Sequence, residues 1–278
     1  MFIKRLWTLG LLGLLGCVGQ LQGYSYSLAP PPVVEGGWYR PNVSTTWQLQ
    51  LQGEVNPRYQ VQLYIIDLFD SPESLLRQLQ SEGKRVICYF SAGSFEPWRP
   101  DAAEFLGAER GKPVAGFEEE RWLDIRSSNV HRILLKRMDL AVQKRCDGVD
   151  PDNVDGYAND TGFDLSFDDQ LAFNRSIANE AHARGLAVSL KNDLDQVGAL
   201  LAYVDFSVNE QCHAFEECSL LAPFIAAGKP VFNVEYESHY VQTVSVRERL
   251  CQEALAQNLR TLILPRELDD AFRFSCDE

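Results

Sequence analysis

The feature that most limits the possible folds of this chain is a regular alternation of short β-type runs and helical patterns from Val43 onward. Several of the β-type runs are almost continuously apolar, which is typical of parallel strands covered by helices on their outer face. Eight such strands with helices in most gaps predict a single-domain (β/α)8 TIM barrel over residues 42–278. The expected strands are 46–51, 64–69, 85–90, 148–150, 186–190, 205–209, 231–234 and 261–264.

The helical patterns carry recognisable end signals. Ser71 and Ser166 are expected N-caps, and Gly83 and Gly185 are expected helix ends. A doubly wound open sheet is the competing arrangement, but no glycine-rich phosphate-binding motif follows the first strand. The expected helices cover 72–82, 130–145, 167–184, 197–202, 220–227 and 246–258.

The N-terminal residues do not belong to the expected barrel. Lys4 and Arg5 precede a short apolar run, which predicts a signal peptide over residues 1–16 and export from the cytoplasm. The sequence Leu-Leu-Gly before Cys17 resembles a lipobox, so we expect a lipid on Cys17 and attachment to the cell envelope. Ordinary secretion, with cleavage nearby, is the alternative. Prolines and glycines predict an extended tether over residues 17–41.

Six further cysteines favour disulfides, because an even number is typical of exported chains. The overall pairing is open, although Cys212 and Cys218 are close enough in sequence to close one small loop. Zinc is the alternative, but the spacing contains no pair typical of a zinc site.

The chain is acidic, with 26 Lys and Arg against 39 Asp and Glu, a formal net charge of −13. A negative field repels phosphate backbones, so a nucleic-acid partner is not expected. The same field favours a cationic ligand, although many acidic proteins are simply soluble. We expect a monomer that requires neither cofactor nor metal.

The densest acidic cluster is the run CDGVDPDNVDGY at residues 146–157. Because strand side chains alternate, Asp150 and Asp152 are expected to point together into the barrel mouth, with Asp155 in the following loop. The alternatives are an Asp-rich turn that caps a helix and a calcium loop, but the spacing lacks the glycine and terminal glutamate of an EF-hand.

Ionisable and hydrogen-bonding residues recur at the ends of other strands, where the active sites of such barrels lie. Two carboxylates that face each other across a cleft can protonate a glycosidic oxygen and support the developing oxocarbenium ion. Aromatic side chains at the same rim can stack on sugars. The expected substrate-binding residues are Trp47, Gln48, Asp67, Tyr89, Asp150, Asp155, Tyr157, Lys191, Asn192, Glu235 and Tyr236.

Several motifs in order resemble glycoside hydrolase family 114. They are residues 47–50, the run CYFSAGS at 88–94 with Glu96, Trp98 and Arg99, residues 122–126, the Asp-rich run, Lys191-Asn192 and residues 209–212. The resemblance implies a TIM-barrel endo-α-1,4-polygalactosaminidase, and related barrels occur beside exopolysaccharide and biofilm machinery. Carried over to this chain, the implied catalytic residues are Asp152 and Glu210. Asp150 shares the motif and is the alternative to Asp152.

We therefore expect an exported glycosidase that cleaves a cationic galactosamine polymer. Two other hypotheses remain: a non-catalytic polysaccharide-binding lipoprotein, and a glycosidase with another sugar specificity. The sequence leaves open which acid is the nucleophile and whether the reaction retains or inverts configuration.

Overall fold

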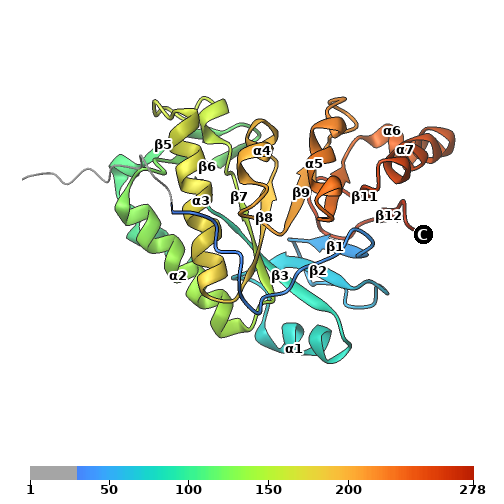
Figure 1. The fold of residues 1–278 in the computed structure, drawn as a ribbon, viewed down its shortest axis with the longest axis horizontal. Coiled ribbons are helices and arrows are strands. Elements are labelled where there is room, and N and C mark those ends of the chain that lie inside the picture. Colours follow the sequence, from blue (N-terminus) through green and yellow to red (C-terminus); the bar gives the residue numbers. More distant parts are fainter. Residues whose placement is uncertain (1–29) are drawn as a thin grey trace, which may run out of the picture.

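A computed structural model describes residues 30–278, in which eight parallel strands curl around a common axis with helices outside them (Figure 1). The order is β1-β2-β3-β7-β8-β9-β10-β11, and a short β12 pairs antiparallel with β11. This is the expected (β/α)8 class. The strands are β1 Trp47–Gln50, β2 Leu63–Asp67, β3 Arg85–Ser91, β7 Gly148–Asp152, β8 Ala187–Lys191, β9 Phe206–Glu210, β10 Val231–Glu235, β11 Arg260–Ile263 and β12 Phe274–Ser275.

Side-chain alternation divides each strand between the barrel interior and the layer beneath the helices. One apolar cluster fills the interior and includes Leu63, Ile65 and Phe232. A larger cluster lies between the strands and the helices. At the seam between β1 and β11, Trp47 Nε1 donates to Arg260 O at 2.9 Å. The interior positions at the C-terminal strand ends are polar, which directs the chemistry to that end of the barrel.

The helices largely follow the expected ranges. Ser166 caps its helix by accepting from the Asp169 N–H, as expected. The predicted cap at Ser71 is wrong, because the helix begins one residue later and Pro72 takes the N-cap position without a side-chain bond. The helices are α1 Glu73–Ser81, α2 Ser128–Lys144, α3 Phe167–Ala183, α4 Val197–Leu200, α5 Ala222–Ala226, α6 Ser238–Gln242 and α7 Val244–Ala256, with short 3-10 turns at Ala102–Glu104, Gly107–Glu109, Gly156–Ala158, Leu194–Gln196 and Cys218–Leu221.

The long segment after β3 contains a second sheet that the sequence did not predict. The strands β4 Ser94–Phe95, β6 Phe117–Leu123 and β5 Arg110–Val114 pair antiparallel in that order. Leu123 N donates to Gly93 O, which ties the end of β6 to the end of β3. The sheet therefore stands at the C-terminal end of the barrel strands.

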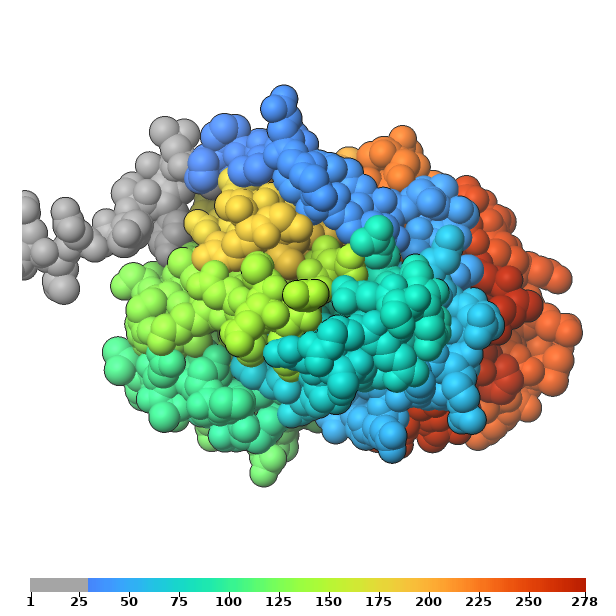
Figure 2. Space-filling view, turned by 90° about the horizontal axis from the view of Figure 1, so that it is seen from below, coloured from blue at the N-terminus to red at the C-terminus, as the bar shows by residue number. Residues whose placement is uncertain are grey.

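The expected tether differs from the structure over its described part. Residues 30–41 run along α3 (Figure 2) and pack on the barrel instead of extending away from it. Trp38 is buried, stacks on His182 and donates through Nε1 to Asp205 Oδ1 at 2.9 Å. The predicted signal peptide and Cys17 lie outside the described residues. Within residues 30–278, no helix has the length and apolar character to cross a membrane.

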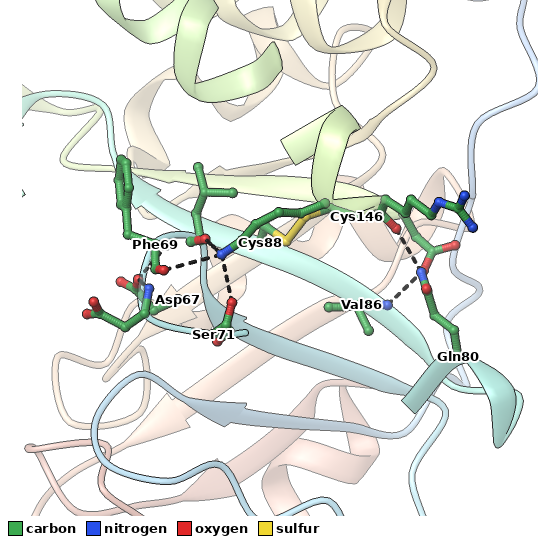
Figure 3. The surroundings of a disulfide bond; sticks show 12 residues. Asp67, Phe69, Ser71, Gln80, Val86, Cys88 and Cys146 are labelled. Carbon is green, nitrogen blue, oxygen red and sulfur yellow. Dashed lines mark hydrogen bonds between the residues drawn. A yellow bond between two sulfur atoms is a disulfide. The ribbon is translucent and has the colours of Figure 1, made fainter. Parts of the chain in front are cut away.

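Three disulfides join the six remaining cysteines, and the pair expected from sequence, Cys212–Cys218, is one of them. Cys251–Cys276 joins α7 to the residue after β12. Cys88–Cys146 joins β3 to the residues after α2, and Figure 3 shows it with Phe69 and Ser71 on one side and Gln80 and Val86 on the other. Disulfides are typical of exported proteins.

Candidate active site

Period-two alternation places Asp150 and Asp152 of β7 on the inside of the barrel, as the sequence predicted, but at different depths. Asp150 is fully buried, and Ser189 Oγ donates to its Oδ1. Burial raises the pKa of Asp150 to about 6, although Lys191 and Ser189 oppose the shift. Asp152 lies at the mouth with 18% of its side chain exposed. Asp152 is therefore the carboxylate of β7 that a ligand can reach.

Glu210 ends β9 and also opens to the mouth, with 29% of its side chain exposed. Asn192 Nδ2 donates to Glu210 Oε2 at 3.0 Å, and the Tyr236 hydroxyl donates to Oε1 at 2.6 Å. Asn192 Oδ1 also accepts from the Glu210 N–H at 2.9 Å. These partners fix the direction in which the carboxylate points.

Lys191 joins the two carboxylates. Its Nζ lies 3.1 Å from Asp152 Oδ2 and 3.7 Å from Glu210 Oε2, and its side chain is only 3% exposed. Burial opposes the charge, but Asp152 and Glu210 together hold the pKa of Lys191 above its ordinary value. One cation thus stabilises two carboxylates that belong to different strands.

Tyr89 supports Asp152 from the other side. The Tyr89 hydroxyl donates to Asp152 Oδ2 at 3.0 Å, and the ring lies 5.6 Å from Lys191 Nζ. Burial and the neighbouring Asp152 carboxylate hold the pKa of Tyr89 well above its usual range. The Tyr89 hydroxyl therefore stays protonated at neutral pH and donates to Asp152.

The loops after β7 and β8 add two acidic side chains, Asp155 and Asp193, and the phenol of Tyr157. Burial and Asp152 raise the pKa of Asp155 to about 6. Burial and Asp155 raise the pKa of Asp193 to about 8, while Asn174 Nδ2 donates to Asp193 Oδ2 at 2.8 Å. Burial, and after it the Asp193 carboxyl, raises the pKa of Tyr157 to about 12. Sequence reasoning missed Asp193, although it follows Lys191-Asn192 directly.

A further carboxyl group, that of Glu120 in β6, was also not predicted from the sequence. Ser94 Oγ donates to Glu120 Oε2 at 2.7 Å, and burial raises the Glu120 pKa to about 7, with Glu96 and Asp152 adding to the shift. The alternation of Glu118, Glu120 and Trp122 is the available signal, but a run of three glutamates is more typical of an exposed loop.

Besides the buried Asp150, four expected substrate-binding residues are not available to a ligand. Trp47 is 1% exposed and packs in the barrel interior against Phe232, so no sugar can stack on it. Gln48 points outward from the barrel and accepts from Arg273 Nε at 2.8 Å. Both residues lie in the half of β1 away from the mouth.

Asp67 and Glu235 are also unavailable. Both Asp67 oxygens accept from Arg99, at 3.0 and 2.7 Å, and the carboxylate is 5% exposed. Glu235 points outward from β10 and is fully buried, where its Oε1 accepts from His213 N at 2.9 Å and from Asn233 Nδ2 at 3.0 Å. These two carboxylates hold loops in place.

One group in the described chain has metal-ligand geometry. The ligand atoms of Cys212, His213 and Cys218 lie within 4.8 Å of one another. The two sulfurs are bonded to each other, so they are not free to ligate a metal.

A TIM barrel with two reachable carboxylates from different strands across its C-terminal mouth has the architecture of a carboxylate-dependent glycoside hydrolase. The comparisons with known proteins agree. The chain belongs to glycoside-hydrolase family GH114, whose family model matches residues 29–278, and it is a glycoside hydrolase.

Solved structures and a curated relative give further similarity. The crystal structure of Aspergillus fumigatus Ega3 in complex with galactosamine has a TM-score of 0.82 and 40% identity, covering 86% of this chain and 97% of that one. The glycoside hydrolase domain of PelA from Pseudomonas aeruginosa shares the fold, with a TM-score of 0.64 and 13% identity over 81% of this chain and 96% of that one. An uncharacterised Deinococcus radiodurans protein is 26% identical over 303 residues, 93% of this chain and 96% of that protein.

Proposed function

We propose that this chain is an exported endo-acting glycoside hydrolase that cleaves α-1,4-linked galactosamine polymer with Asp152 and Glu210. The observation that carries the proposal is the Lys191 ammonium, which lies 3.1 Å from Asp152 and 3.7 Å from Glu210. The galactosamine in the Ega3 crystal structure, a relative of 40% identity, supports an amino-sugar substrate.

The separation of the two acids favours a retaining mechanism. Their nearest oxygens can be no further apart than the two Lys191 distances laid end to end, about 7 Å. Retaining enzymes have carboxyl groups about 5–5.5 Å apart, whereas inverting enzymes need about 6.5–9.5 Å for a water molecule. The bound of about 7 Å covers the retaining separation and only the lower end of the inverting range, so we propose the retaining mechanism.

In the proposed first step, Asp152 is the nucleophile and Glu210 is the acid. Lys191 and Tyr89 both contact Asp152 Oδ2 and stabilise its anion, which suits attack on the anomeric carbon. Glu210 is the more exposed of the pair and gives its proton to the leaving glycosidic oxygen as the carbon–oxygen bond breaks. The product is a glycosyl ester on Asp152 and a shortened chain.

In the second step, Glu210 removes a proton from water, which attacks the anomeric carbon and releases Asp152. Each group then has its starting protonation state, so the cycle balances. Asp150 is not exposed, and in this scheme it acts from below by adding negative charge beside Lys191.

The cleft also suits a cationic polymer. Asp155, Glu120 and Asp150 add carboxyl groups to the neighbourhood of the acid pair, while Lys191 is shared between Asp152 and Glu210. An amine near an exposed carboxylate gains on the order of 1 kcal/mol from such a pair.

The direct test is hydrolysis of purified α-1,4-galactosamine polymer by the wild type, Asp152→Asn and Glu210→Gln. We expect each variant to lose at least about a thousandfold in kcat, with Asp155→Asn as a charge-matched comparison that loses far less. Wild-type-like cleavage by a variant that carries both Asp152→Asn and Glu210→Gln would overturn the assignment. Binding without any cleavage by the wild type would favour a polysaccharide-binding protein instead.

Parallel reactions on N-acetylated polymer test the sugar specificity. We expect slower turnover there, and turnover on the deacetylated polymer that falls with ionic strength because salt screens the charge attraction. Faster turnover of the acetylated polymer would contradict the proposed substrate.

The N-terminal region completes the proposal. We propose that residues 1–16 are removed as a signal peptide, that Cys17 is acylated, and that the barrel domain over residues 42–278 works as a monomer at the cell envelope. Mass spectrometry of the N-terminal peptide from membranes tests the acylation, and an unmodified N-terminus in the culture medium would refute it.

A further inference from the structure

Glu120 occupies a defined position on the inserted sheet. Along β6 the buried face carries Trp122, which is 6% exposed, and Glu120 lies two residues earlier on the same face. Glu119 lies on the opposite face and is exposed to solvent. Of these two neighbours, only Glu120 is therefore turned toward the barrel.

A continuous set of contacts connects Glu120 to Asp152. Ser94 Oγ, which donates to Glu120, lies 2.6 Å from Ser91 Oγ. Asn153 Nδ2 donates to Ser91 Oγ at 2.9 Å, and the Asn153 N–H donates to Asp152 Oδ1 at 2.7 Å. The inserted sheet thus holds Glu120 in fixed relation to the proposed nucleophile.

Glu120 differs from its acidic neighbours in its charge balance. Asp67 and Glu96 both pair with Arg99 at 2.7 Å, and Lys191 serves Asp152 and Glu210. Over residues 30–278, no Lys, Arg or His forms an ion pair with Glu120; its hydrogen bond comes from a neutral hydroxyl.

The surroundings of Glu120 make its ionised form costly. Burial raises the pKa of Glu120 to about 7, Glu96 and Asp152 add to the shift, and Arg99 opposes it at longer range. A half-buried carboxylate without a cation is costly. A bound cation would relieve that cost, so the position favours a positively charged ligand group.

We propose that Glu120 binds the amine of a galactosamine unit beside Asp152 and so selects the deacetylated polymer. The inference rests on the proposed function. An ammonium supplies the missing positive charge and three donors, whereas an acetamide is neutral and bulkier. Glu120 is in this view a specificity-determining residue, and the chemistry remains with Asp152 and Glu210.

The test measures binding without turnover, in the Glu210→Gln background. The probes are an α-1,4-galactosamine hexamer and its N-acetylated counterpart, and the added changes are Glu120→Gln or Glu119→Gln. The amide that Glu120→Gln introduces keeps an oxygen that accepts from Ser94, so the sheet is left intact. Glu119→Gln changes the net charge equally on the solvent face.

We expect Glu120→Gln to raise the Kd for the amine hexamer about five- to tenfold and the Kd for the N-acetylated hexamer less than about twofold. Glu119→Gln should leave both within about twofold. The salt dependence of amine-hexamer binding should weaken only for Glu120→Gln, because a charge contact is then lost.

Equal loss for both hexamers would overturn the inference, since it would mean that Glu120 only supports the Asp152 region. No change for either hexamer would overturn it as well. Failure of the proposed function is distinguishable: the parent Glu210→Gln protein would then prefer the N-acetylated hexamer, whatever residue stands at position 120.

Discussion

At the residue scale, Lys191 is the side chain on which the geometry of the site depends most. Two carboxylates facing one cleft disfavour each other's charge, and the nearby Asp150 adds to that repulsion. The ammonium, buried between them, offsets it. Removal of this charge should therefore change both the rate and its pH dependence.

We predict that Lys191→Met lowers kcat/KM on galactosamine polymer on the order of 100-fold, because preorganised charge is lost from the site. The acid limb of the pH–rate profile should move to higher pH, because the site loses the positive charge that favours ionised carboxyl groups there and that lowers the pKa of Asp150. Lys112→Met, at an exposed ion pair with Asp160, is the control. An unshifted acid limb would contradict the role given to Lys191.

The wrong predictions for individual residues have physical reasons. Glu235 and Gln48 lie on strands whose two faces are both buried, so apolar alternation does not reveal which face is inside. Asp67 ends its strand at the mouth as expected, but Arg99, 32 residues later in sequence, returns to pair with it. A partner so distant is not visible in the local pattern.

At the element scale, β7 shows what a strand pattern can predict. Its two aspartates share the interior face because alternation is strict over five residues. The barrel strands were predictable from their short, almost continuously apolar runs, and most helices from their apolar periodicity and end signals. The inserted β4-β6-β5 sheet was not, because β4 has only two residues, β5 and the first part of β6 are largely exposed, and register shifts interrupt the pairing of β5 with β6. Glu120 was missed with it.

The Cys88–Cys146 disulfide is a second feature at this scale, because it links two secondary-structure elements. It joins β3 to the chain just after α2, and Lys144 Nζ donates nearby to the carbonyls of Leu68, Phe69 and Ser71. The loop that carries Asp67 toward Arg99 is thereby attached to α2. The link bridges 58 residues, so its loss should free a large part of the unfolded chain.

We predict that Cys88→Ser with Cys146→Ser lowers the free energy of unfolding by about 4 kcal/mol in the chain-entropy treatment. Cys212→Ser with Cys218→Ser, which opens a loop of only 6 residues, should cost about 2 kcal/mol. Urea unfolding under non-reducing conditions measures both. A larger loss for the shorter loop would contradict this account.

At the scale of the whole molecule, the acidic mouth affects folding as well as binding. Burial raises the pKa of Asp193 to about 8 and that of Glu120 to about 7, so both bind protons more tightly in the folded chain than when unfolded. Their contribution to stability is full below the unfolded pKa, about 4, and is lost as pH rises through these folded values.

We predict that the free energy of unfolding falls by about 1.5 kcal/mol between about pH 7 and 8.5, with the partly exposed Glu120 contributing the smaller share. Burial lowers the pKa of His131 and His213, so above about pH 7 both are mainly neutral in either state and do not mask the trend. Asp193→Asn should flatten the dependence, which urea titrations at several pH values would detect. Rising stability over this range would show that the acidic mouth is not the cause.

The most direct test of the central claim, that Asp152 and Glu210 act as a close pair across the barrel mouth, is the anomer formed first. Proton NMR that follows the anomeric signals during cleavage of α-1,4-galactosamine polymer reads it before mutarotation. The account predicts the α-anomer, because the pair is close enough for a glycosyl ester on Asp152. The β-anomer as first product would contradict it.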